Sequence, residues 1–506
     1  MNVAAKKCPV TQVRCSRSSA TEALNPVFAP PERDVIVLAM LFHRYRLPDF
    51  LFAIVSLSLA LVGAGCGGQT AAPAPPGVKP DAGGGTGGVT GSGGVSGSGG
   101  GSGGSGNGGD GGASVDTGVP AVDASAEGGG DVASGGVTIS LYNVMAGGTV
   151  KTFDPITADM NRVEMPPRFT LQANVPAGTK SVAFQLTGQP VRVDDAAPFL
   201  LNETAAAAAP WAVGAGSYDI TVTAYAAAGA QGDPTGRLTQ TVKILSTGMD
   251  PNFVKQSDAE NLAWINQNVE TALATKTFTS STGHVLPYRL YTPKFVSTAV
   301  KYPFFIFLIG RAERGSNNAT YRNLGMSGTN QLFVGPRSIV APNMQQEFPS
   351  FVLIPQCSTN PDESWRGSES EKATFELMDM MLKDKAIPLD PDRIYLTGLS
   401  MGGEGTWDFV VRRPTTFACA VPLSGLYSDT TKAAGIKNVP FWVFHSLADE
   451  QNGVANSQRM VAAMKAAGAP VIKYTEYVTE RHVASFMRVW TMELDLLPWM
   501  FAWWKK

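Results

Sequence analysis

The sequence is poor in charge, in histidine and in cysteine, and each shortage excludes a class of function. Charged residues make up 16% of the 506 residues and the formal net charge is −2, so no basic field is available to bind nucleic acid. The four histidines and five cysteines form no metal-ligand cluster. We therefore expect neither a nucleic-acid partner nor a bound metal or organic cofactor.

The sequence also lacks a long apolar run near its start. Residues 50–62 are largely apolar, whereas a membrane span needs about 20 such residues. Arg44 and Arg46 precede this run, and small residues lead from it to Cys66. The pattern resembles a bacterial lipoprotein signal with Cys66 as the lipidated residue, and a transmembrane anchor is the alternative. We assign residues 1–66 to an over-extended start followed by this signal.

Such a signal implies export. We expect a protein that is lipid-anchored at the outer membrane or cell surface, or that lies in the periplasm, with the membrane as its partner through the lipid. Once the signal is removed, the chain retains Cys357 and Cys419 in addition to the lipidated cysteine. An oxidising compartment would allow these two to form a disulfide, and buried free thiols fit the sequence equally well.

Three stretches of different composition follow the signal. Residues 67–136 are mostly Gly, Ser, Ala, Pro and Asp, which cannot offset the entropy of ordering, so we predict a disordered linker. Residues 137–247 carry short alternating runs between turn residues; they predict a β-sandwich and resemble a bacterial immunoglobulin-like domain. We favour a spacer role for it over carbohydrate or partner binding.

The last stretch, residues 252–506, alternates predicted strands and helices. Several of its strands are continuously apolar, as is expected when helices cover both faces of a sheet. The pattern predicts an α/β domain with a mostly parallel sheet.

Ser400 lies in a Gly-Leu-Ser-Met-Gly sequence between a predicted strand and a predicted helix. Residues 393–397 fit a strand, 398–402 a sharp turn, and the helix begins at Gly403, which is the context of a nucleophile elbow. A helix N-terminus favours a developing negative charge. The backbone N–H of Met401 is therefore the first predicted oxyanion donor.

A serine hydroxyl needs a base before it can act as a nucleophile. His482 is the last histidine and lies in a predicted loop after the last predicted strand, which is the position of the base in the chain order serine, acid, histidine. A surface or helix-capping histidine is the alternative, and His445 is expected to brace a turn. Asp449 follows a strand and is the predicted acid that orients the imidazole, with Glu450 as runner-up.

The second oxyanion donor is expected in the loop that follows the apolar stretch YPFFIFLIG. That loop continues with Arg311, whose backbone N–H is the candidate, and an ordinary connecting loop is the alternative. Asp408 and Asp429 are expected to be solvated.

These residues give the last half of the chain a family resemblance. It resembles α/β-hydrolase esterases of the phospholipase/carboxylesterase and "predicted peptidase" type, related to polyhydroxybutyrate-depolymerase-like and feruloyl-esterase-like enzymes. The resemblance covers about residues 278–504 and is strongest in DPDRIYLTGLSMGGEGTWDFVVRRPTTFACAVPLSG. It implies a triad at Ser400, Asp449 and His482, and an immunoglobulin-like domain also precedes such esterases in relatives.

Four positions depart from the family pattern. Ile309 stands where a histidine is usual before the oxyanion glycine, and Ser446 stands where a glycine is usual after the histidine of the acid loop. Arg481 precedes the predicted base in place of a common glycine, and Glu404 replaces a frequent aromatic residue. Glu404 and Arg311 together would favour a polar or charged substrate if they lie near the pocket.

The sequence therefore predicts a secreted, surface-tethered serine esterase that forms an acyl-enzyme. The resemblance implies ester substrates such as polysaccharide-linked acyl or feruloyl groups. Three alternatives stay open: a serine peptidase, an acyl transferase to an alcohol, and a catalytically weak or inactive hydrolase fold that serves as a surface carbohydrate-binding or adhesion module.

Overall fold

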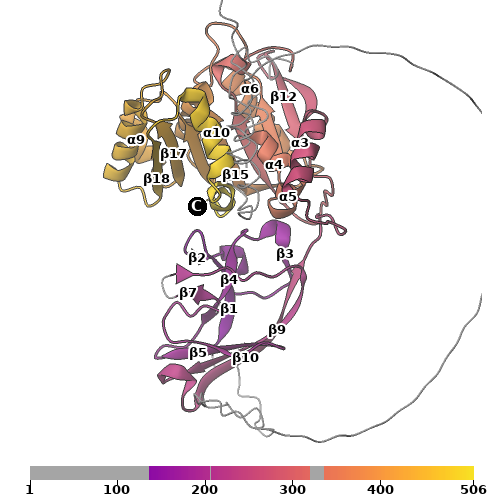
Figure 1. Cartoon of the computed structure of the whole chain (residues 1–506), viewed down its shortest axis with the longest axis vertical. Coiled ribbons are helices and arrows are strands. Elements are labelled where there is room, and N and C mark those ends of the chain that lie inside the picture. The colour runs from indigo at the N-terminus through magenta and orange to yellow at the C-terminus, as the bar shows by residue number, and fades with distance from the viewer. Residues whose placement is uncertain (1–135, 205–206, 319–334, 506) are drawn as a thin grey trace, which may run out of the picture. The chain divides into compact units, whose positions relative to one another are not determined.

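The computed structural model describes residues 136–204, 207–318 and 335–505 (Figure 1). The predicted signal, the lipidation site at Cys66 and the predicted linker lie outside these ranges. Within them, no helix combines the length and the apolar character that crossing a bilayer requires.

The first described region is built mainly from β-strands, with three short 3₁₀ turns between them. A three-stranded sheet has the order β2-β1-β4, a five-stranded sheet has the order β3-β10-β9-β5-β6, and β7 pairs with β8. The strands are β1 (Thr138–Asn143), β2 (Gly148–Thr149), β3 (Met160–Asn161), β4 (Phe169–Asn174), β5 (Ser181–Leu186), β6 (Arg192–Asp194), β7 (Glu203–Thr204), β8 (Ala207–Ala208), β9 (Gly216–Tyr225) and β10 (Pro234–Leu245).

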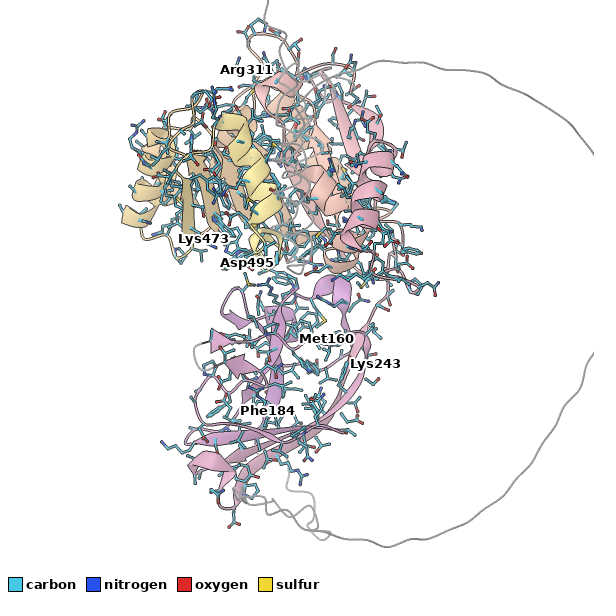
Figure 2. All side chains as sticks on the ribbon, in the orientation of Figure 1. Met160, Phe184, Lys243, Arg311, Lys473 and Asp495 are labelled. Atoms are coloured by element: carbon cyan, nitrogen blue, oxygen red, sulfur yellow. The ribbon has the colours of Figure 1, made fainter. Side chains whose placement is uncertain are left out.

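Alternating apolar residues give these strands a buried face. Met160 and Phe184, both labelled in Figure 2, are completely buried and belong to one apolar cluster with Leu171 and Val222. Successive side chains of a strand point to opposite faces, so apolar residues at every second position gather on one face. The immunoglobulin-like character of this region and its spacer role stay predictions.

The second region is built on an eight-stranded sheet with the order β11-β12-β14-β13-β15-β16-β17-β18. The pairings among β13 to β18 are parallel, whereas β11 and β12 are antiparallel to their neighbours. The predicted mostly parallel sheet is thus confirmed. Its strands are β11 (Ala274–Thr279), β12 (Val285–Tyr291), β13 (Tyr302–Leu308), β14 (Phe351–Pro355), β15 (Leu389–Leu399), β16 (Cys419–Leu423), β17 (Phe441–Ser446) and β18 (Ile472–Tyr477).

Helices pack against this sheet (Figure 1). Every residue of β13, β14 and β16 is buried, which explains why these strands are continuously apolar. The helices are α3 (Asp258–Ala272), α4 (Pro336–Val340), α5 (Pro342–Glu347), α6 (Glu369–Lys383), α7 (Met401–Arg412), α8 (Ala433–Ile436), α9 (Ala455–Ala466), α10 (His482–Met492) and α11 (Leu496–Met500).

The parallel strands bring the predicted site residues to one edge of the sheet. Ser400 follows β15, Asp449 lies beyond β17 and His482 lies beyond β18, while Arg311 lies beyond β13. In Figure 2, Arg311 lies at the end of this region opposite to Lys473, which is near the start of β18. Ligand sites of open α/β sheets lie outside the carboxyl ends of the strands, which is the edge these residues occupy.

Two local expectations need correction. Strand β15 runs on to Leu399 and α7 begins at Met401, so the turn consists of Ser400 alone and not of residues 398–402. The predicted base, His482, is the first residue of α10 and not part of a loop. The α7 boundary falls at Ser400, whose side chain forms no capping hydrogen bond, and the α10 boundary falls at Arg481, a residue type that gives no N-cap signal in a sequence.

Candidate active site

Ser400 adopts a strained backbone conformation between β15 and α7. Its φ of 54° and ψ of −115° are unfavourable for a residue with a Cβ atom. Two hydrogen bonds hold it there: the Ser400 N–H donates to the Leu423 carbonyl at 2.9 Å, and the Glu404 N–H donates to the Ser400 carbonyl at 3.0 Å. This is the geometry of a nucleophile elbow, in which the serine hydroxyl is raised above the sheet.

Glycines let the first turn of α7 lie directly on the neighbouring strands. A Cβ atom on Gly402 would stand 2.0 Å from the Leu308 carbonyl oxygen of β13, and one on Gly403 would stand 2.3 Å from the Leu423 carbonyl oxygen of β16. Both contacts are with backbone atoms, which cannot rotate away. The position of the elbow relative to the end of β13 therefore depends on the absence of these side chains.

Asp449 and His482 are hydrogen-bonded at the same edge of the sheet. His482 Nδ1 lies 2.7 Å from Asp449 Oδ2, and both side chains are almost completely buried. The other oxygen, Oδ1, accepts the backbone N–H groups of Asn452 at 2.8 Å and Gln451 at 2.9 Å. In serine hydrolases a carboxylate in this arrangement fixes the imidazole tautomer and stabilises the imidazolium.

Burial alone would favour the neutral form of Asp449. The hydrogen bonds from His445, His482 and the Asn452 N–H outweigh burial, and they hold the pKa of the Asp449 carboxyl well below its usual range. Asp449 is therefore ionised at neutral pH.

His445 supports Asp449 from behind. Its Nε2 lies 2.9 Å from the Asn452 carbonyl oxygen and 3.3 Å from Asp449 Oδ2. Both neighbours can only accept, so Nε2 carries a proton and donates to them. Nδ1 lies 2.7 Å from the Ser457 hydroxyl, which fixes the ring from the other side. The sequence predicted a turn-bracing histidine, and the structure adds this contact with the acid.

Asn452 connects the acid loop to the elbow, and sequence reasoning missed it. Its side-chain amide donates to the Ser424 carbonyl at 2.7 Å, while its backbone N–H donates to Asp449. Ser424 follows Leu423, which accepts the N–H of Ser400. Asn452 is buried, although an asparagine in a loop usually lies in solvent. Its partner lies 28 positions earlier in the chain, so local sequence held no signal for it.

Glu450, the runner-up for the acid, has a different partner. Its Oε2 accepts the backbone N–H of His482 at 3.0 Å, and its Oε1 lies 3.4 Å from Arg481 Nε. The bond from the His482 N–H is the main reason that the pKa of Glu450 is lowered. Glu450 thus caps the start of α10 from another loop and positions the backbone of His482, whereas Asp449 positions the ring.

The structure does not join all three predicted triad residues. Among the described residues, no hydrogen bond connects the Ser400 hydroxyl with His482. The helix of His482 does contact the end of β16, the strand next to the elbow, since Ser424 Oγ lies 3.4 Å from Ser485 Oγ, which in turn donates to the His482 carbonyl at 2.7 Å. Catalytic hydrogen bonds are often long without substrate and tighten in the complex.

The two predicted oxyanion donors each begin a helical segment. Met401 is the first residue of α7, and Arg311 is the first residue of a 3₁₀ turn that ends at Glu313. The first N–H groups of a helical segment have no acceptor within it, and neither of these two has another acceptor among the described residues. The N–H before Arg311 is different, because Gly310 donates to the Glu313 carboxyl at 2.8 Å.

Charged side chains lie along α7 beyond the elbow. Arg366 lies 3.2 Å from Glu404 and 3.6 Å from Asp408, which also pairs with Arg412 at 2.6 Å. The expectation that Asp408 is solvated is therefore wrong, because it is buried between two arginines. The Asp408–Arg412 pair has the i, i+4 spacing of neighbours on one helix face, so the sequence did contain a signal for it. The neighbouring Trp365 donates its indole N–H to the Ile309 carbonyl at 2.8 Å.

The two remaining cysteines do not form a disulfide. Cys357 and Cys419 are free and completely buried. Burial raises the pKa of the Cys357 thiol to about 12, so the thiol is neutral.

No protein-family model matches the sequence, and no curated protein sequence matches it. Several solved structures resemble it. A thermostable esterase is 22% identical with a TM-score of 0.42, covering 73% of this chain and 96% of its own. A ferulic acid esterase is 17% identical with a TM-score of 0.34, covering 45% and 97%. A fluorophosphonate-binding serine hydrolase of Staphylococcus aureus is 16% identical with a TM-score of 0.35, covering 46% and 98%.

Proposed function

We propose that this chain is a serine hydrolase of the α/β-hydrolase type that cleaves carboxylic esters. The observation that supports it best is the buried Asp449–His482 pair, at the same sheet edge as the strained turn of Ser400. A buried carboxylate on one imidazole nitrogen prepares the other nitrogen to accept a proton. A strained serine at a helix N-terminus is what such a base would activate.

In the proposed reaction, Ser400 Oγ attacks the ester carbonyl while His482 Nε2 accepts the hydroxyl proton. The backbone N–H groups of Met401 and Arg311 stabilise the oxyanion of the tetrahedral intermediate. His482 returns the proton to the leaving alcohol, and an acyl-enzyme remains. A water molecule then repeats these steps and releases the acid, so the chemistry is complete with side chains and backbone of this chain alone.

The substrate and location are part of the proposal. We infer an exported, lipid-anchored enzyme from the segment that ends at Cys66, and polysaccharide-linked acyl or feruloyl esters as substrates from the family resemblance. Glu404, on the first turn of α7 after the elbow, pairs with Arg366 of the loop before α6, and this pair supports a polar substrate.

The test is hydrolysis of p-nitrophenyl acetate and butyrate by the full chain and its variants. Ser400→Ala and His482→Ala are expected to lower kcat by several orders of magnitude, because nucleophile and base act as one unit. Two matched controls, Ser428→Ala on the exposed surface and His284→Ala before β12, are expected to keep wild-type rates.

Three other outcomes would contradict parts of the proposal. Equal rates for wild type and Ser400→Ala in folded protein would reject catalysis at this serine and favour the binding-module alternative. Cleavage of peptide p-nitroanilides at rates above the esters would make the chain a peptidase. Ester products formed with added alcohol, in place of free acid, would make it an acyl transferase.

A further inference from the structure

The oxyanion turn contains a buried carboxyl group that the reaction above does not use. Glu313 closes the 3₁₀ turn of residues Arg311–Glu313 and is completely inaccessible to solvent. Its Oε2 accepts the Gly310 N–H at 2.8 Å. Its Oε1 is buried and has no hydrogen-bond partner among the residues that the structure describes. A buried carboxyl with one donor only is unusual and needs a reason.

The bond to Gly310 decides which amide of the turn stays free. The Glu313 side chain occupies the Gly310 N–H, so the next N–H, that of Arg311, is the first one available to a substrate oxygen. Glu313 is itself held through its backbone, since its N–H donates to the Gly310 carbonyl at 3.3 Å and its carbonyl accepts the Gln356 side chain at 3.1 Å. The side chain therefore fixes the direction of the turn.

The surroundings of Glu313 favour its neutral form. The charged and titratable groups around the turn are Arg311 and Arg314 on the turn, Cys357 after β14 and Glu363 in the following loop. The Arg314 guanidinium donates to the carbonyls of Asn360 and Glu363, and the Cys357 thiol is neutral. None of these groups forms an ion pair with Glu313 among the described residues.

Burial raises the pKa of Glu313 to about 8, and the backbone N–H groups of Gly310 and of Glu313 itself oppose this only in part. At neutral pH the carboxyl is therefore mostly protonated. A neutral acid still accepts the Gly310 N–H through its carbonyl oxygen. An ionised one would place a negative charge beside a site that must stabilise an oxyanion, and like charges repel strongly where water is excluded.

We propose that Glu313 is a positioning residue that, as a neutral acid, holds the Gly310 N–H and so presents the Arg311 N–H to the oxyanion, and that its ionisation weakens catalysis. This rests on the proposed ester hydrolysis at Ser400. The chemical step is unchanged, because Glu313 neither touches the substrate nor exchanges a proton with it. Its role is to orient the Arg311 N–H toward the oxyanion and to keep negative charge away from it.

The first experiment measures kcat and KM for an acetate ester between pH 6 and 9.5. In the wild type, kcat should fall roughly tenfold to a hundredfold as Glu313 ionises on the alkaline side. Glu313→Gln keeps an acceptor for Gly310 and cannot ionise, so it should match the wild type at pH 7 and lose the alkaline fall. KM should change little in either protein, because the oxyanion forms only in the transition state.

A matched control separates this effect from the general burial of an acid. Glu371 is also buried, accepts the backbone N–H of Gly367 four residues earlier and pairs with Arg412 at 2.8 Å, but it belongs to α6. Glu371→Gln should therefore retain the alkaline fall in kcat. Glu313→Ala, which removes the acceptor, should lower kcat at every pH, by up to the ~10²–10³ that loss of an oxyanion donor costs.

A second measurement does not depend on catalysis. The unfolding free energy of wild type relative to Glu313→Gln should decrease as pH rises from about 5 to 8, with uptake of about one proton on folding. This result would support a neutral Glu313 even if esters were not substrates. Identical pH profiles of kcat for wild type and Glu313→Gln would overturn the proposal, and so would an unfolding free-energy difference that does not change with pH.

Discussion

Two buried carboxyl groups flank the same site and differ in charge. Asp449 accepts two backbone N–H groups and lies within reach of two imidazoles, and its pKa is lowered. Glu313 accepts a single backbone N–H, has an unpartnered oxygen among the described residues, and its pKa is raised. Burial by itself raises the pKa of both carboxyls.

Because both carboxyls are buried, the number of hydrogen-bond donors around each one, more than its burial, determines which of them is ionised. The acid beside the base must be an anion to stabilise an imidazolium. The acid beside the oxyanion donors must be neutral. In the proposed mechanism both needs are met because one loop is surrounded by donors and the other has few.

Replacing each carboxyl by the corresponding amide should have very different effects at the two positions. Asp449→Asn should lower kcat by about 10³–10⁴, because an amide disturbs the tautomer of His482. Glu313→Gln should leave kcat at pH 7 within a few-fold of wild type. Ester hydrolysis at saturating substrate measures both. A comparable loss in the two variants would show that Glu313 is also needed as an anion.

Stability should depend on pH in opposite directions at the two sites. The lowered pKa of Asp449 gives stability that is present above its unfolded value of 3.8 and is lost as pH falls. The raised pKa of Glu313 gives stability that is present below its unfolded value of 4.5 and is lost as pH rises toward about 8, on the order of a few kcal/mol. Denaturant unfolding between pH 3 and 9 measures both effects.

The two amide variants isolate these contributions. Asp449→Asn should flatten the acid side of the stability profile and leave the alkaline side unchanged. Glu313→Gln should do the reverse. A profile that either variant flattens on the wrong side would contradict the charge states inferred for the two carboxyls.

The donors around Asp449 should have a moderate effect. His445→Ala and Asn452→Ala each remove contacts that hold the acid loop, and we expect kcat to fall about tenfold to a hundredfold with little change in KM. Ser457 contacts His445 from the side away from the acid, so Ser457→Ala serves as the control and should lower kcat only a few-fold. Equal losses in all three variants would indicate a general loss of packing.

Glu450 should have the smallest effect. It is exposed and its side chain accepts the backbone N–H of His482, so Glu450→Gln keeps an acceptor and should change kcat by less than about threefold. The same assay that detects the loss in Asp449→Asn checks this. A loss as large as that of Asp449→Asn would exchange the roles of the two neighbouring acids.

The sequence was sufficient for features that depend on chain order and local pattern. Continuous apolar strands predicted the parallel sheet, and the positions after β15, β17 and β18 predicted Ser400, Asp449 and His482, of which the structure hydrogen-bonds the last two. The parallel sheet is confirmed, whereas the catalytic roles of the three residues stay predictions. The residues come to one edge because parallel strands end there whatever the loops contain.

Features that depend on distant partners were not predictable in this way. Asn452 acts through a carbonyl 28 positions away, and Glu450 caps a helix 32 positions away. Glu313 looked like one charged residue among several in a loop, because its burial comes from the packing of other segments. Asp408 was misjudged for the same reason.

The close contact between Gly402 and the end of β13 also limits how such a site can evolve or be redesigned. A side chain at Gly402 would collide with the backbone at the end of β13, so the elbow cannot change shape there without moving the turn that begins at Arg311. New substrate range would have to come from side chains that project from α7 and the 366 loop, such as Glu404 and Arg366. A library directed at that pair would change selectivity, while one directed at the glycines would mostly produce inactive protein.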